Sequence, residues 1–131
     1  MTMKDQLEQL SKALKNVHKQ FLENERIAAE IRLGHALPPL AFFHLLTQDP
    51  SFVWMKPFAS TMAELDEFID KAESITATDV AKYRELVEKL VSDPSSKIAE
   101  RYRQHLMQDS GFVLAHAELR LALDSPAKPQ N

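Results

Sequence analysis

A long stripe of apolar residues near the start of the chain constrains the fold more than any other feature. Its members are alternately three and four residues apart: Leu7, Leu10, Leu14, Val17, Phe21, Asn24, Ala28 and Ile31. This spacing keeps side chains on one face of an α-helix and is typical of a helix that packs against other helices. The stripe predicts one helix over residues 4–33, with Asn24 as a buried polar member and Gly34 as the C-terminal cap.

Prolines divide the following part of the chain into shorter segments. Pro39 suits the first turn of a helix that extends to about Gln48. The pairs Asp49-Pro50 and Asp93-Pro94 each indicate a cap followed by a new helix. Lys56-Pro57 is predicted to be a third break, because a residue before proline avoids helical angles.

The helical period continues in the second half of the chain. Helices are expected over residues 57–72 and 79–92, and Thr76, three residues before Asp79, can cap the second of them. A further helical stretch over residues 94–123, kinked or interrupted at Ser110-Gly111, is expected to match the first helix as a second stave. Its apolar members include Ile98, Tyr102, Leu106, Val113, Ala117 and Leu121.

No segment shows the alternation of a β-strand, and a chain of 131 residues suits one domain. The fold class predicted is therefore an all-α, single-domain helical bundle of five or six helices in a four-stave arrangement, formed by residues 1–124. Residues 125–131, which contain two prolines, are expected to be a disordered tail.

Several chemistries lack the residues that they need. The chain has no cysteine and two glycines, which excludes thiolate sites and argues against a glycine-rich phosphate loop. It contains no Glu-x-x-His, no His-Glu-x-x-His and no Gly-x-Ser-x-Gly motif. We expect no catalytic residue, no metal and no cofactor, although a site assembled from His18, His44 and His105 on different helices stays open.

Charge argues against nucleic acid as a partner. The formal net charge is −3, and residues 34–75 contain six acidic and two basic residues. Basic residues on the first helix, Lys12, Lys15 and Lys19, are interpreted as a solvated face. The charged N-terminal segment has no apolar run typical of a signal peptide or a membrane span, so a cytoplasmic location is expected.

Aromatic residues crowd into one short segment. Phe42, Phe43, Phe52, Trp54 and Phe58 supply half of the aromatic residues of the chain. One interpretation is that they close the end of the bundle where short helices turn over the core. The other is a pocket or a docking surface, because aromatic anchors are enriched at binding sites.

The candidate binding residues are accordingly Phe52, Trp54, Lys56 and Phe58, with Lys56 as a positive rim.

The same segment carries a resemblance. The run Leu-Leu-x-x-Asp-Pro-x-Phe-x-Trp-x-x-Pro begins at Leu45 and ends at Pro57, and a helix with a Leu-Asp-Glu run follows it. This pattern resembles a family of small uncharacterised bacterial all-helical proteins over residues 37–72. Where the family usually has arginine, this chain has Lys56. The resemblance implies a helical fold and brings no activity, cofactor or catalytic residue with it.

Three functional hypotheses follow. The first is a non-enzymatic binding or interaction module with an unknown protein partner, and it predicts an exposed surface around Phe52, Trp54 and Lys56. The second is a bundle that binds a small apolar ligand or a metal, and it predicts a cavity lined by the aromatic residues with a convergent polar group. The third and weakest is a small enzyme. A homo-oligomer is possible under each of them.

Overall fold

The computed structural model describes residues 1–124, and every regular element in that part of the chain is a helix. The elements are α1 (Met3–Leu33), α2 (Pro39–Gln48), the 3₁₀ helix η1 (Pro50–Met55), α3 (Lys56–Lys71), α4 (Ala77–Ser92), α5 (Lys97–Gln108) and α6 (Ser110–Asp124). The all-α prediction is confirmed. The predicted tail, residues 125–131, lies outside the described residues.

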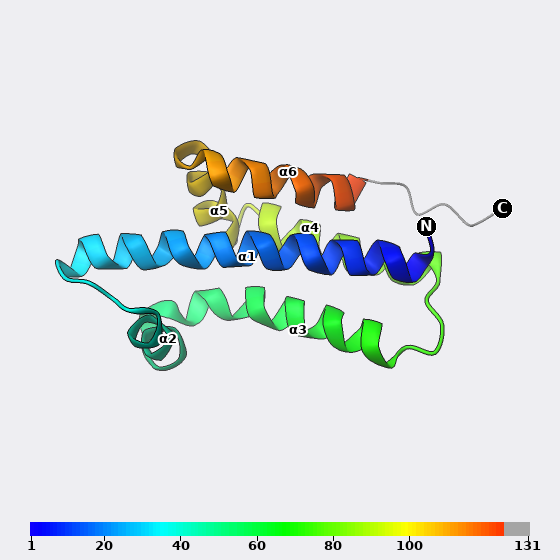
Figure 1. Cartoon of the computed structure of the whole chain (residues 1–131), viewed down its shortest axis with the longest axis horizontal. Coiled ribbons are helices and arrows are strands. Elements are labelled where there is room, and N and C mark those ends of the chain that lie inside the picture. Colours follow the sequence, from blue (N-terminus) through cyan, green and yellow to red (C-terminus); the bar gives the residue numbers. More distant parts are fainter. Residues whose placement is uncertain (125–131) are drawn as a thin grey trace.

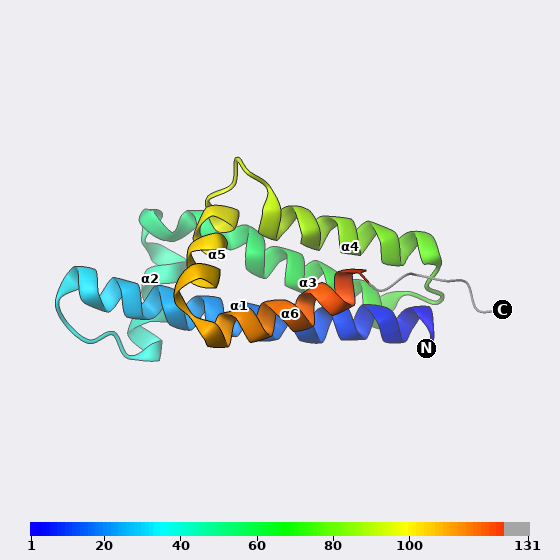
Figure 2. The ribbon, with the colours of Figure 1, turned by 90° about the horizontal axis from the view of Figure 1, so that it is seen from above.

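Four helices form the staves of the bundle, and α1 is the central one. Helices α3 and α6 lie on opposite sides of α1, and α4 packs behind it (Figure 1). Helices α1 and α4 run in one direction and α3 and α6 in the other (Figure 1). The short helices α2 and α5 cross the same end of the bundle, and α1 extends past α5 at that end (Figure 2).

The first half of the apolar stripe forms the centre of the core. Its five members from Leu7 to Phe21 are fully buried. Beyond Phe21 the prediction is wrong: Glu25 and Ala29 are buried, whereas Ile31 is 79% exposed. A straight helix has 3.6 residues per turn, so a repeat of 3.5 drifts off the buried face. The end of α1 also lies beyond the crossing of α5 (Figure 2), where little covers it.

Residues 94–123 do not form a single stave. Asp109 is extended, with φ −135° and ψ 110°, and it separates α5 from α6. Its Oδ1 accepts a hydrogen bond from the backbone N–H of Gly111 at 2.9 Å, so Asp109 begins a new helix rather than a kink. Of the two helices α5 and α6, only α6 runs alongside α1 (Figure 1).

The break at Asp109 also resets the helical register. The apolar stripe predicted for residues 98–121 assumed one continuous period, and it is wrong in α6: Val113 is 43% exposed and Leu121 is 71% exposed. The buried members of α6 are Phe112, Ala115, Leu119 and Ala122.

Local capping signals agree with the structure at most positions, but Asp93-Pro94 does not start a helix: Asp93 is the C-cap of α4, and α5 begins at Lys97 with Ser96 as its N-cap. Gly34 caps α1 in the left-handed region at φ 77°, and Thr76 and Asp79 form a capping box on α4. The boundary predicted at Lys56-Pro57 is confirmed, because η1 ends at Met55 and α3 begins at Lys56; the expected reason is wrong, because Lys56 is itself helical at φ −55° and ψ −41°. Pro57 lies in the first turn of α3, where its missing N–H removes no hydrogen bond.

Polar side chains connect the staves along their edges. Asp66 of α3 accepts a hydrogen bond from Ser11 and pairs with Lys15, both of α1. Arg120 of α6 makes two bonds of 2.7 and 2.9 Å to Glu88 of α4. No helix among residues 1–124 is both long enough and apolar enough to cross a lipid bilayer.

Candidate functional site

An apolar hollow of about 310 Å³ lies where α2, η1 and α3 meet the middle of α1, and we call it the corner groove. Most of its lining is apolar, and the remaining members are one imidazole, one hydroxyl and one ammonium group. The lining residues are His18, Leu22, Phe43, Leu46, Thr47, Phe52, Met55, Lys56 and Ala59. An apolar lining with a few polar groups is typical of sites for small molecules.

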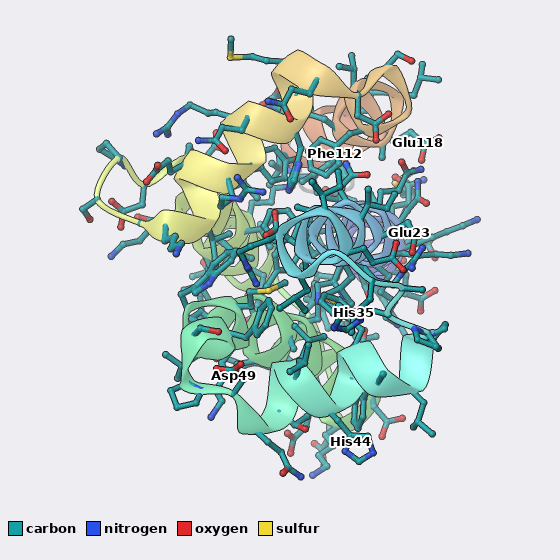
Figure 3. All side chains as sticks on the ribbon, turned by 90° about the vertical axis from the view of Figure 1, so that its left-hand side faces the viewer. Glu23, His35, His44, Asp49, Phe112 and Glu118 are labelled. Atoms are coloured by element: carbon teal, nitrogen blue, oxygen red, sulfur yellow. The ribbon has the colours of Figure 1, made fainter. Side chains whose placement is uncertain are left out.

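The groove exists because α2 covers the core incompletely. This helix is rich in leucine and phenylalanine, yet Phe42 is its one buried residue, while Leu40 is 69% and Phe43 57% exposed. It is held mainly by η1, through an edge-to-face contact of Phe42 with Phe52 at 5.8 Å. Viewed from this end of the bundle, α2 is the outermost helix, with His44 on its outer side (Figure 3).

His18 is the polar group on the α1 wall of the groove. Its ring is half-buried, packs on Phe58 at 4.7 Å between centroids, and makes no hydrogen bond to any described residue. Burial lowers the pKa of His18, because the charged imidazolium loses hydration there. At neutral pH the ring is therefore uncharged, with one N–H donor and one acceptor nitrogen.

Lys56 lines the groove from the start of α3. Its side chain is exposed and forms no ion pair with any described residue. Lys71, the other basic residue in the acidic segment 34–75, pairs with Glu67 at 2.7 Å. The corner groove therefore carries a cation and no carboxylate in a segment that is otherwise acidic.

The structure divides the four predicted binding residues among three places. Phe52, 5% exposed, and Lys56 line the corner groove. Phe58 is fully buried behind it, 5.4 Å from Phe21 between ring centroids. Trp54 is half-buried on the α5 side, edge-on to Phe21 at 6.2 Å.

The sequence predicts Lys56 as the positive group of this site. In the structure the cation over the Trp54 ring is Lys97 of α5, at 5.0 Å.

The sequence did not single out the α1 wall of the groove. His18 and Leu22 are four residues apart, next to the buried stripe residues Val17 and Phe21. A pair at this spacing forms a second, narrower face of the helix. This spacing could have indicated that His18 faces a neighbouring helix, but it does not identify that helix.

A second histidine site lies about two turns further along α1, where α5 packs against it, and we call it the Glu25 cluster: Glu25, Arg101 and His105. Glu25 is 6% and His105 4% exposed. The Glu25 Oε2 accepts hydrogen bonds from His105 Nε2 at 2.6 Å and from Arg101 Nε at 3.0 Å. Arg101 Nη2 lies 2.8 Å from the same oxygen.

Electrostatics keep Glu25 ionised. Burial works to raise the pKa of Glu25, but the hydrogen bonds and charges of His105 and Arg101 outweigh it and hold that pKa below its usual range. An open hollow beside the cluster is lined by Asn24, Gln108 and Asp109 among others. Asn24 Nδ2 donates to Asp109 Oδ2 at 3.0 Å, so here too polar groups bond within the chain.

The remaining histidine pairings are also internal. Tyr102 and His116 form a hydrogen bond of 2.7 Å between Oη and Nδ1. Burial raises the pKa of Tyr102 and lowers that of His116, so the phenol donates and the imidazole accepts. His18, His44 and His105 do not meet, and residues 1–124 contain no group of three side chains placed to hold a metal ion.

Comparison with models of known protein families, with curated proteins and with solved structures found no match to this chain.

Proposed function

We propose that the protein is a non-enzymatic binding protein and that the corner groove is its site for a small apolar molecule. The observation that carries the proposal is an apolar hollow beneath a helix, α2, that buries only Phe42. The second sequence hypothesis predicted such a cavity, with aromatic residues and a convergent polar group. Phe43 and Phe52 supply the rings, and His18 supplies the polar group.

The size of the groove limits the ligand. About 310 Å³ is at the small end of ligand sites. At roughly 30 Å³ for each water-sized atom, the groove holds about ten non-hydrogen atoms. A straight-chain alcohol such as 1-octanol is therefore a suitable probe, with an expected Kd of about 0.1–1 mM at ordinary ligand efficiency.

The experiment fills the groove and asks whether binding is lost. Ala59 lines the groove on α3, and Ala63 lies one turn further along the same helix, outside the lining; both are exposed. Titration of 1-octanol by nuclear magnetic resonance should shift amide signals of residues around the groove. The Ala59→Phe variant should lose at least tenfold in affinity, and the matched Ala63→Phe variant should bind as the original chain does. Equal binding by all three proteins, or no binding by the original chain, would refute the proposal.

A protein partner is the second candidate, because Leu40 and Phe43 of α2 are largely exposed beside the groove. A partner helix could cover them with its own apolar face. Under this alternative, Leu40→Ser should abolish partner binding and leave 1-octanol binding intact. A cytoplasmic location and self-association belong to the proposal as well, and sedimentation at several protein concentrations tests the latter.

A further inference from the structure

The charges around the corner groove are unlike those of the segment that builds it. Residues 34–75 contain six acidic and two basic residues, yet no carboxylate lines the groove. Lys71 is neutralised by Glu67, whereas Lys56 has no ion pair among the described residues. A cation at the edge of an apolar hollow attracts anions, because the low-dielectric wall weakens screening on one side.

The α1 wall of the groove offers a second polar contact. His18 has no hydrogen-bond partner among the described residues, although it is half-buried. Its ring nitrogens are not buried, so they are accessible to a ligand in the groove. Thr47, the third polar lining residue, already donates its hydroxyl proton to the backbone of Phe43 or His44, at 3.1 or 3.2 Å. His18 and Lys56 are therefore the two groups left to bind a polar head.

We infer that the corner groove takes a small apolar carboxylate, with its apolar body between α2 and α1 and its carboxylate on Lys56 and His18. This inference rests on the proposed function, and it specifies the chemical class of the ligand. One ammonium group and one imidazole N–H match a single negative charge with two acceptor oxygens. A phosphate group carries more charge and is usually held by several donors, which this groove does not provide.

The test compares two probes of similar size, octanoate and 1-octanol, that differ in the charged head. The original chain should bind octanoate about fivefold more tightly, because an exposed ion pair and one hydrogen bond contribute modestly. Lys56→Met should reduce that preference about threefold to fivefold, and Lys56→Gln serves as a second variant. Lys71→Met removes the same charge from the same helix and should leave both affinities unchanged.

Added salt gives an independent readout, because it screens the exposed Lys56 contact. Raising the salt concentration from about 0.02 to 0.5 M should weaken octanoate binding and should not weaken 1-octanol binding. Equal affinities for the two probes would overturn the carboxylate inference and leave the proposed function standing. A preference for octanoate that survives both Lys56 substitutions would overturn it too. Failure of both probes to bind would instead refute the proposed function.

Discussion

The corner groove and the Glu25 cluster both place a histidine against the core, about two turns apart along α1, and they differ in how the nitrogens of that histidine are used. In the Glu25 cluster, His105 donates to Glu25 at 2.6 Å and Arg101 completes the set. In the corner groove, His18 has an aromatic neighbour and no hydrogen-bond partner among the described residues. The comparison teaches that a histidine is a better ligand-site candidate where the fold leaves its nitrogens unsatisfied.

The largest effect should come from the paired site. Glu25→Ala should lower the free energy of unfolding by about 3–5 kcal/mol, because it leaves Arg101 and His105 without their buried partner. Urea denaturation followed by circular dichroism measures the loss. The control is Glu23→Ala, an exposed residue of the same helix that pairs with Arg26, with an expected cost of no more than about 1 kcal/mol. Similar losses in both variants would contradict the assignment of the Glu25 cluster as the structural site.

A smaller loss of stability should follow from Trp54→Ala. Trp54 packs on the α5 side and does not line the corner groove. Trp54 is half-buried against Phe21 and beneath Lys97, so we expect a cost of about 2–3 kcal/mol, below that of a fully buried tryptophan. Trp54→Phe keeps a ring in place and should cost less. Denaturant unfolding by circular dichroism gives both values. Because Trp54 does not line the groove, 1-octanol should still bind; loss of binding with little loss of stability would reverse the roles of Trp54 and His18.

Acid should weaken the paired site by protonating Glu25. The pKa of folded Glu25 lies below its ordinary value of 4.5, so the folded state binds fewer protons than the unfolded state there. The stabilisation is therefore present above about pH 4.5 and is lost as pH falls through the folded pKa. Thermal unfolding at a series of pH values should show this decline. Glu25→Gln should make the acid side of the profile flatter, and an unchanged slope would contradict the role of Glu25.

The smallest change in stability should come from the open site. His18→Leu removes a polar ring that has no hydrogen-bond partner within residues 1–124 and replaces it with an apolar side chain against Phe58. We expect the free energy of unfolding to rise by less than about 1 kcal/mol. Denaturant unfolding measures it beside the Glu25 variants. A loss of 3 kcal/mol or more would mean that His18 is as structural as His105, and the contrast between the two sites would fail.

Short-range features of the fold could be predicted from the sequence. The extent of α1, the left-handed cap at Gly34 and the capping box at Thr76 each depend on residues within a few positions of one another. The crowding of aromatic residues also marks the part of the chain that forms the corner groove, since Phe52 and Lys56 line it. These predictions hold because helical period and capping are local properties of the chain.

Only the tertiary structure decided which histidine is paired and which faces the groove. His18 and His105 look alike in the sequence, but Glu25 lies 80 residues from His105 along the chain. The break at Asp109 turns α5 across the bundle and brings His105 to Glu25, while the crossing of α2 leaves His18 uncovered. The sequence determined the helices and their local ends; packing determined their crossings, because these depend on contacts between residues distant in the chain.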